Sequence, residues 1–311
     1  NYLFSRNHSV PYSMIGLFIG WLRYYHKIEL LTSALNVYVD NNEKMSNIKE
    51  YIKSQGIEIK GIKFGKSKAQ YFMDKDENAI SQGISSIKYC NDQIADELYE
   101  LSKNHYDNFV DLLSDIISKT SVDDRQLHIL TTLNFFSEFG KNKYLLSIID
   151  MYNLLGKCKT LKKDKIASLN IREEDVRKCA EKETPKQYSN VDKDKLVKLM
   201  ISGLENKSLS IKEQIVYEQE YLGNIMYKNP KAPKDMYYVL ECKFYKDKTK
   251  PYLMLYNMRD GEYLKTKITS GKSFIESPFI AGNVINVKEF GERNKMKKVG
   301  GDWIKTDEKE R

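Results

Sequence analysis

The sequence predicts an α+β multidomain protein in which a long helical part precedes a small β-rich part. Apolar residues recur at three- and four-residue steps through the first half of the chain, which is the spacing of helical faces. After Pro230 and Pro233, short β-rich runs separated by turn residues replace that spacing. The chain has 311 residues and 41% hydrophobic content. This is enough for about two or three domains with a core in each.

Residues 9–36 are expected to form a buried helical element, as one helix or as two in succession. Their apolar side chains recur at helical spacing from Val10 to Leu30. Pro11 is tolerated in the first turn of a helix, and Ser9 is placed to cap that turn. The helix is therefore expected to start at Val10.

Further helices are expected through the middle of the chain. One covers residues 42–55 and ends at Gly56, because glycine best tolerates the left-handed conformation that follows a helix. Residues 57–64 alternate in the manner of a strand or an extended segment. The other predicted helices lie within residues 84–101, 107–117 and 124–136.

Residues 156–198 are dense in Lys, Glu and Asp and hold few large apolar side chains. This composition is typical of solvated helices and loops or of a mobile connector. We therefore expect a charged helical connector between the helical block and the β-rich part.

The β-rich runs near the end have the spacing of a small closed sheet. Turn residues at 260–261 and 281–283 separate some of the runs. A five-stranded OB-type β-barrel fits this pattern, and an SH3-like barrel fits it nearly as well. The runs cover residues 236–244, 251–257, 263–268 and 284–290.

The charge balance favours a polyanionic partner. There are 51 Lys and Arg against 43 Asp and Glu, a formal net charge of +8, and 22 Tyr and 12 Phe can stack on bases or fill cores. The apolar stretch at residues 14–22 is too short to span a membrane, and no signal peptide is indicated, so a cytoplasmic protein without a membrane partner is expected. The cysteines show neither metal-ligand nor disulfide spacing; they are Cys90, Cys158, Cys179 and Cys242.

Several segments carry motifs that follow one another in a fixed order. Residues 4–12 read FSRNHSVPY, close to a pattern F-N-K-S-H-S-x-A-Y, and the remaining segments lie at residues 21–26, 41–72, 82–88, 124–140 and 218–230. Together they resemble the C family of bacterial replicative DNA polymerases, the polymerase III alpha subunits. The departures are residues 64–66, where the family has a proline-containing stretch, and residues 89–92, where it has hairpin glycines.

The resemblance implies the C-terminal part of such a polymerase, from the late fingers through an OB-fold. Its implied domains are the end of the fingers (1–79), a helix-hairpin-helix and clamp-binding-type helical region (80–155), the charged connector (156–233) and an OB-fold domain (234–311). Asn1 is not a start methionine, so the chain is expected to be a piece of a longer protein. The implied function is that of a fragment of a DNA-directed DNA polymerase, a nucleotidyltransferase of bacterial or phage DNA replication. Its partners would be primed DNA, single-stranded template and dNTP.

The fingers resemblance implies a nucleotide-binding surface at Arg6, His8 and Ser9, where charged and hydrogen-bonding groups hold a triphosphate. The alternative is that His8 and Ser9 only cap the following helix. Arg23 and Lys27 lie at helical spacing and either extend a basic DNA-binding face or form a solvated face.

Two further DNA-binding sites are implied. In the hairpin, glycine amides of the family approach phosphates closely. Here residues 89–92 replace those glycines and Asp92 adds repulsion, so Lys88 is the candidate contact and a purely structural hairpin is the alternative. In the barrel, interleaved aromatic and basic residues suit a single-strand platform, with a structural barrel or an RNA-binding protein as alternatives. The barrel residues are Lys243, Tyr245, Tyr252 and Tyr256.

Asp235, Met236 and Tyr237 stand where the family carries a segment that docks on the sliding clamp. The leading glutamine of that segment is missing. The alternative is that these residues begin the first strand of the barrel.

The sequence shows no carboxylate constellation for two metal ions about 4 Å apart, the arrangement that phosphoryl transfer needs. The family keeps its catalytic aspartates and Mg in a palm domain upstream of the fingers motif. The fragment alone is therefore expected to bind no cofactor and not to polymerise. The competing hypothesis is a non-catalytic single-stranded DNA-binding or replication scaffold protein.

Overall fold

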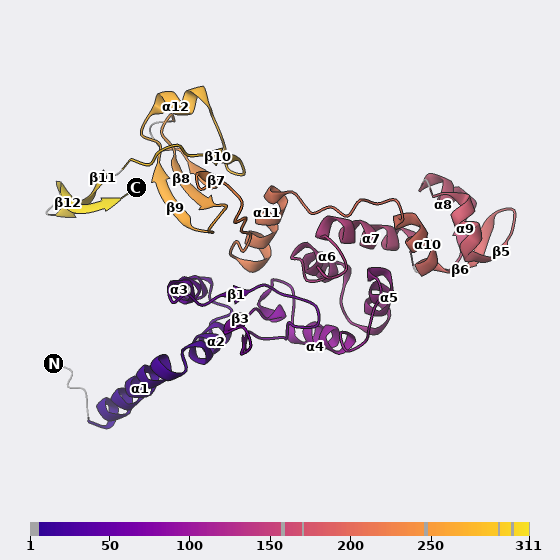
Figure 1. The fold of residues 1–311 in the computed structure, drawn as a ribbon, viewed down its shortest axis with the longest axis horizontal. Coiled ribbons are helices and arrows are strands. Elements are labelled where there is room, and N and C mark those ends of the chain that lie inside the picture. Colours follow the sequence, from indigo (N-terminus) through magenta and orange to yellow (C-terminus); the bar gives the residue numbers. More distant parts are fainter. Residues whose placement is uncertain are drawn as a thin grey trace. The chain divides into compact units, whose positions relative to one another are not determined.

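The computed structural model shows an α+β chain that divides into two compact units (Figure 1). The larger unit comprises residues 1–210 and 217–224, and the smaller unit comprises residues 211–216 and 225–311. The finer division into four domains stays a prediction. No helix among those described combines the length and the apolar content needed to cross a bilayer. The structure describes residues 6–156, 159–169, 171–245, 248–291, 293–299 and 302–310.

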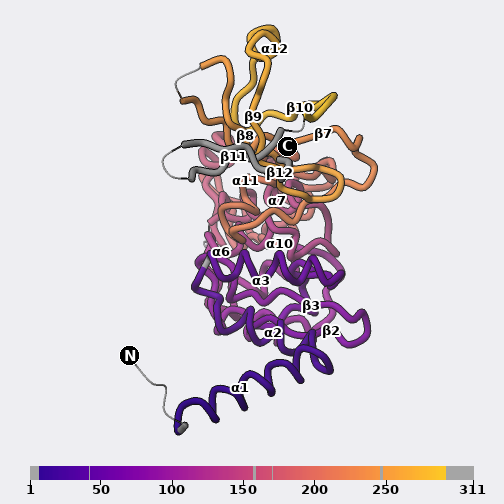
Figure 2. Tube along the Cα trace, turned by 90° about the vertical axis from the view of Figure 1, so that its left-hand side faces the viewer, coloured from indigo at the N-terminus to yellow at the C-terminus, as the bar shows by residue number. Residues whose placement is uncertain are grey.

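The larger unit begins with two helices joined at a bend, α1 (Arg6–Tyr25) and α2 (Lys27–Val37), which Figure 2 traces in succession. Helix α1 starts four residues before the expected Val10, so Pro11 lies inside the helix rather than in its first turn. The expected burial of this element is correct only for α2, whose apolar side chains enter a core. Most large apolar side chains of α1 are at least half exposed.

Helix α3 (Asn42–Ser54) packs on α2 and on a three-stranded sheet. The sheet has the order β1-β3-β2, from β1 (Ile59–Lys60), β3 (Ala79–Ser81) and β2 (Phe72–Asp74). The predicted helix end is confirmed, since Gly56 follows α3 with a φ of 69°. The shared core comprises Ile28, Leu31, Leu35, Met45, Ile52, Tyr71 and Ile80.

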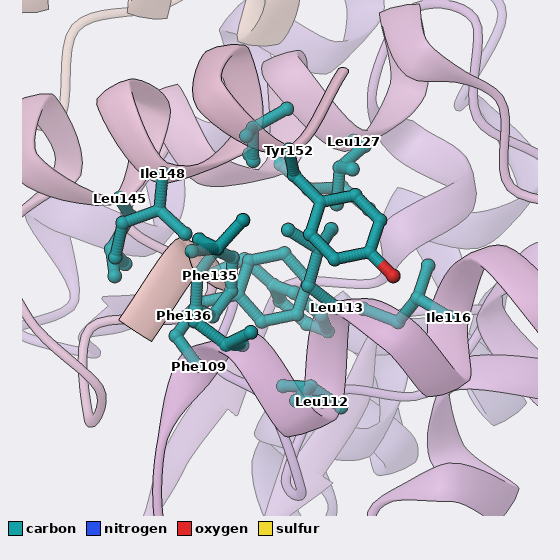
Figure 3. Close-up of a cluster of buried hydrophobic side chains, with 14 of the residues drawn as sticks. Phe109, Leu112, Leu113, Ile116, Leu127, Phe135, Phe136, Leu145, Ile148 and Tyr152 are labelled. Atoms are coloured by element: carbon teal, nitrogen blue, oxygen red, sulfur yellow. The ribbon is translucent and has the colours of Figure 1, made fainter. Parts of the chain in front are cut away.

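A block of short capped helices forms the centre of the larger unit. It holds a 3-10 turn (Ile84–Ser86), α4 (Asp92–Leu101), α5 (Phe109–Lys119), α6 (Asp124–Thr132) and α7 (Asn142–Leu155). An Asx side chain at each start of α4, α5 and α6 accepts a bond from a backbone amide of its first turn. Phe136 is fully buried and its ring lies 4.8 Å from that of Phe135 and 5.3 Å from that of Phe109 (Figure 3).

The segment expected to be a charged connector is a folded module, and that prediction is wrong. It holds β4 (Leu161–Lys162), α8 (Lys163–Ser168), α9 (Glu173–Cys179), β5 (Ala180–Glu183), β6 (Gln187–Val191) and α10 (Lys193–Ile201), with the sheet order β4-β6-β5. Tyr188 is fully buried, and Ile166 and Val176 also belong to the main core. Singly spaced apolar residues among many charges are therefore enough to build this core.

Helix α11 (Ile211–Leu222) leads to the smaller unit, whose centre is an antiparallel sheet. The sheet has the order β10-β7-β8-β9 and is made of β7 (Met236–Lys243), β8 (Tyr252–Asn257), β9 (Tyr263–Lys267) and β10 (Val284–Asn286). Helix α12 (Gly271–Glu276) lies between β9 and β10 in the chain. A separate hairpin follows, β11 (Arg293–Val299) and β12 (Asp302–Glu310).

The expected five-stranded OB-type barrel is not confirmed. Within the described part of the chain, β9 and β10 are the two edges of the four-stranded sheet, and β11 and β12 pair only with each other. The strand positions predicted from the sequence are found, but the sheet is open, since no further strand among the described residues joins its two edges.

Candidate nucleic-acid interface

The hairpin before α4 keeps a tight turn although it lacks glycine. The amide of Cys90 donates to the carbonyl of Ile87 over 3.0 Å, and Tyr89 takes a φ of 73°. A positive φ at this place in a turn normally favours glycine, and a bulky residue there is a backbone outlier. The chain thus retains a glycine-type hairpin and places an aromatic side chain on it.

Two cationic side chains lie close to the Tyr89 ring. The Arg125 guanidinium carbon lies 3.3 Å from the ring centroid, and Lys88 Nζ lies 5.0 Å from it. Lys88 first, and then Arg125, lower the pKa of the Tyr89 phenol by favouring its ionised form. We call Lys88, Tyr89 and Arg125 the hairpin cluster.

Contacts from α6 hold the hairpin in place. Gln126 Nε2 donates to the Tyr89 carbonyl over 3.0 Å, and the same residue closes the capping box of α6 with Asp123. The amide of Lys88 donates to the carbonyl of Tyr221 over 3.1 Å. The hairpin backbone is therefore held at Lys88 by the backbone of Tyr221 and at Tyr89 by the side chain of Gln126.

The Asp92 carboxylate accepts a hydrogen bond from the Ser85 hydroxyl. Its negative charge remains. The sequence indicated Lys88 but not Arg125, because only the fold brings the start of α6 against the hairpin.

The residues implied for nucleotide binding lie at the start of α1. The side chain of Arg6 is outside the described residues, His8 is exposed and Ser9 is half-buried. His8 and Ser9 lie inside the first turn of α1, because the helix starts at Arg6 rather than after Ser9.

Arg23 contacts a side chain of α3, and Lys27 contacts the residue that caps the end of α3. The Arg23 guanidinium carbon lies 5.0 Å from the centroid of the Tyr51 ring, and Lys27 Nζ donates to Gln55 Oε1 over 2.9 Å. These contacts tie α1 and α2 to α3, so the two basic residues have a structural role whether or not they meet DNA.

On the four-stranded sheet, an aromatic pair is exposed at one end of β8. The rings of Tyr245 and Tyr252 lie 5.2 Å apart, and Lys267 Nζ is 4.8 Å from the centroid of Tyr252. Lys243 forms an ion pair of 2.6 Å with Glu241, which raises the pKa of its ammonium group. The exposed part of the implied platform therefore consists of Tyr245 and Tyr252 with lysines beside them.

Tyr256 does not belong to that platform. It is 1% exposed, and its hydroxyl donates to the carbonyl of Tyr227 over 2.7 Å. Alternation places Tyr256 on the same face of β8 as the exposed Tyr252. At the Tyr256 end that face is covered by a core that includes Ile215 and Ile225, so the assignment of Tyr256 to base stacking is corrected.

The residues implied for clamp binding lie at the start of β7. Met236 and Tyr237 pair with β10 and with β8 or the turn after it, and the Tyr237 ring lies 5.5 Å from that of Phe290. Asp235 just before them is exposed. Met236 and Tyr237 thus form part of an interior strand, which is the alternative that the sequence left open.

Over the described ranges, no group of three or more His, Cys, Asp or Glu residues is placed to hold a metal ion.

Comparison with curated proteins finds similarity to proteins named DNA polymerase III subunit alpha over about half of the chain. A DNA polymerase III subunit alpha from Ureaplasma parvum serovar 3 is 24% identical over 147 residues, 47% of this chain and 15% of that protein. The one from Bacillus subtilis strain 168 is 27% identical over 153 residues, 49% and 14% of the two chains. The one from Buchnera aphidicola subsp. Schizaphis graminum is 27% identical over 154 residues, 48% and 13%.

No family model matches the chain. The matched region spans 13% to 15% of each relative's length. The chain is therefore distantly related, over about half of its length, to proteins named DNA polymerase III subunit alpha.

Proposed function

We propose that this chain is part of a DNA-directed DNA polymerase of the polymerase III alpha type and that it contributes DNA contacts to replication. The single observation that carries the proposal is the similarity to three curated proteins named DNA polymerase III subunit alpha. The net charge of +8 suits a polyanionic partner. The palm aspartates and their Mg would lie in the rest of the parent protein.

The hairpin cluster is the DNA contact that the geometry supports best. A guanidinium stacked on an aromatic ring still presents N–H groups at its edge, where a phosphate can accept two hydrogen bonds. Lys88 supplies a second cation 5.0 Å from the centroid of the Tyr89 ring. Such contacts hold the DNA backbone without reading the sequence.

The nucleotide contacts at Arg6, His8 and Ser9 are part of the same proposal and rest on the fingers resemblance. Clamp docking by Asp235, Met236 and Tyr237 is not part of the proposal, because Met236 and Tyr237 pair with neighbouring strands on both sides.

The proposal is tested by fluorescence anisotropy of the full chain with labelled primed DNA across a salt series. The Lys88→Gln, Arg125→Gln variant should lower the slope of log affinity against log salt by about 2, since each phosphate contact contributes about 1. The Lys103→Gln, Lys119→Gln variant has the same charge change on exposed lysines that are paired with Glu100 and Asp115 and should keep the wild-type slope.

Equal slopes for the two double variants would remove the hairpin cluster from the interface. Absence of DNA binding by the wild-type chain at low salt would contradict the proposed DNA contacts altogether. Primer extension by the chain alone is expected to be undetectable, and extension would show that the catalytic carboxylates lie within it.

A second candidate function, a non-catalytic single-stranded DNA-binding protein, is favoured by the exposed Tyr245 and Tyr252 pair. Bases stack on such rings with little sequence preference. Tighter binding to single-stranded than to primed DNA, lost in the Lys243→Ala, Tyr252→Ala variant, would favour this candidate.

A further inference from the structure

The module over residues 159–201 has the chain order of a winged helix-turn-helix. Strand β4 is followed by α8, α9 and the β5–β6 hairpin, and Figure 1 labels these last four elements. The sheet order β4-β6-β5 places the last strand, β6, in the middle. Helix-turn-helix units bind DNA in many proteins, but the fold alone assigns no function. The surface chemistry of this module decides what it can bind.

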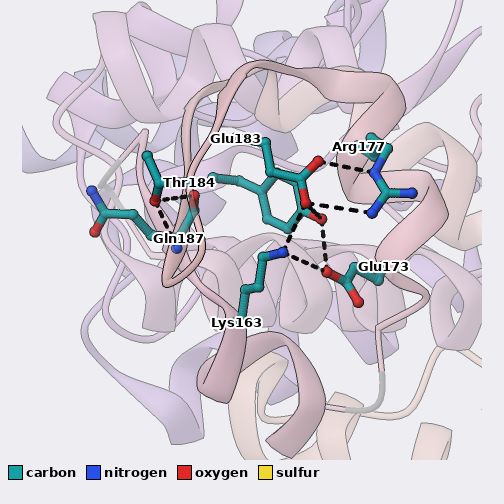
Figure 4. Close-up of polar contacts among 7 residues, drawn as sticks. Lys163, Glu173, Arg177, Glu183, Thr184 and Gln187 are labelled. Atoms are coloured by element: carbon teal, nitrogen blue, oxygen red, sulfur yellow. Dashed lines mark hydrogen bonds and ion pairs between the residues drawn. The ribbon is translucent and has the colours of Figure 1, made fainter.

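The helical side of the module is poorly suited to DNA. The first turn of α9 carries Glu173 and Glu174, which would repel phosphates, and Arg177 is held by Glu183 at 3.0 Å. Lys163 Nζ lies 2.7 Å from Glu183 and 3.1 Å from Glu173 (Figure 4). Lys163 and Arg177 on the helical side are therefore already paired with carboxylates of the same module.

Strand register separates the charges of the sheet onto its two faces. Leu161, Tyr188 and Glu183 are cross-strand neighbours and lie on the helical side, where Tyr188 is buried and its hydroxyl bonds Glu173 and Glu183. The next residue along each strand must face the other way. That outer face therefore carries Lys162 opposite Gln187 and Lys182 opposite Ser189.

Lys186 lies in the bend at the tip of the hairpin, next to Gln187 of this face. Thr184 closes the tip: its amide and its hydroxyl both donate to the carbonyl of Gln187 over 2.9 Å (Figure 4). Lys162, Lys182 and Lys186 are all exposed. The carboxylate nearest in sequence, Glu181, alternates away from Lys182 and accepts a bond of 2.8 Å from Asn190.

We propose that Lys162, Lys182 and Lys186, with Gln187 and Ser189, form a phosphate-contacting surface, the lysine face, on which this module binds the backbone of duplex DNA. Lysine, glutamine and serine side chains are common donors to phosphate oxygens, and a rigid sheet presents them at fixed spacing. DNA is the proposed ligand because its negatively charged backbone complements three exposed lysines. The inference rests on the proposed function for its partner and adds a second DNA contact outside the hairpin cluster.

The test compares two triple variants of the full chain by anisotropy with a labelled duplex across a salt series. The Lys162→Gln, Lys182→Gln, Lys186→Gln variant should lower the slope of log affinity against log salt by about 2 to 3. The matched control is Lys165→Gln, Lys178→Gln, Lys195→Gln, which removes three exposed lysines from the helices of the same module and should keep the wild-type slope. Thermal melting of both variants checks that they remain folded.

Two duplexes of unrelated sequence should lose affinity equally, since phosphate contacts do not read bases. If the wild-type chain binds DNA and the lysine-face variant shows the same salt slope as the wild type, this inference is wrong. The proposed contact at the hairpin cluster is not affected by that result. An equal loss in the control variant would overturn the assignment to the outer face. No binding by the wild-type chain would overturn both proposals together.

Discussion

Helix α1 and helix α5 carry similar apolar patterns but lie in opposite environments. In α5, Phe109, Leu112 and Leu113 are at most 3% exposed, whereas in α1 Leu17 is 75% and Phe18 is 62% exposed. Both segments show helical spacing, and both are helices. Periodicity therefore predicts that a helix forms and has an apolar face, but it does not predict whether a neighbour within the same chain covers that face.

The largest loss of stability should follow truncation of Phe136, which packs against Phe109 of α5 in the buried environment. This ring is fully buried among Phe64, Phe109 and Phe135. We expect Phe136→Ala to lower the free energy of unfolding by about 3–5 kcal/mol, from lost burial and the cavity left behind. Urea denaturation measures this, and a loss below about 1 kcal/mol would mean that the block repacks.

Gly83 tests how tightly the start of the block packs on its neighbours. A Cβ at Gly83 would lie 2.3 Å from the carbonyl carbon of Gln70 and 2.4 Å from the carbonyl oxygen of Ala69. Because backbone atoms cannot rotate away, Gly83→Ala should cost about 1–3 kcal/mol of stability in the same denaturation experiment. Gly203→Ala is the control, since no atom lies within 4 Å of its Cβ position, and equal effects would contradict the close approach.

The cap of α6 should contribute less to the free energy of unfolding than the buried core does. Asp123 accepts a bond of 2.7 Å from the amide of Gln126, whose side chain accepts from the Asp123 amide in return. Asp123→Ala should cost about 1 kcal/mol in thermal or chemical unfolding. Asp123→Asn keeps an acceptor and should cost clearly less; similar losses for the two variants would argue against the cap.

The Glu183 network predicts a pH dependence. Lys163, then Arg177 and Tyr188, lower the pKa of the Glu183 carboxyl from 4.5 to about 2. A lowered folded-state pKa contributes stability that is complete above 4.5 and is lost as the pH falls through about 2. The difference in melting temperature between wild type and Glu183→Gln should therefore shrink below pH 4.5. A difference that does not change with pH would contradict this linkage.

The smallest effect is expected on α1 itself. Phe18→Ala removes an exposed ring, so the free energy of unfolding should change by no more than about 0.5 kcal/mol. If urea denaturation of the chain shows a loss near that of Phe136→Ala, α1 is covered in solution and the comparison of environments fails.

The predicted helices and strand runs of the chain were largely found because their signals are local. Asn91, Asn108 and Asp123 cap the helices of the central block, and Gly56 follows α3. The module over residues 159–201 was missed because its core residues, such as Leu161 and Tyr188, are single apolar positions among charges. Strand spacing likewise predicted the strands of the smaller unit but not whether the sheet closes, since closure depends on pairing between strands far apart in the chain.

Within the candidate interface, the sequence indicated Lys88 and the exposed Tyr245 and Tyr252. It missed Arg125 because the contact with Tyr89 exists only after α6 docks on the hairpin. Tyr256 was misassigned because it shares a face of β8 with the exposed Tyr252, and only the fold brings Ile215 and Ile225 over the Tyr256 end of that face.

The exposure of α1 also gives the protein an optical reporter. Trp21 in α1 is 50% exposed, and its ring lies 5.0 Å from His26 at the bend. The chain contains two tryptophans, Trp21 and Trp303, so a Trp303→Phe variant would confine indole fluorescence to α1. Emission from a hydrated indole lies at longer wavelength than emission from a covered one. A blue shift on adding DNA or another part of a polymerase would then show, without any attached dye, that α1 had become covered.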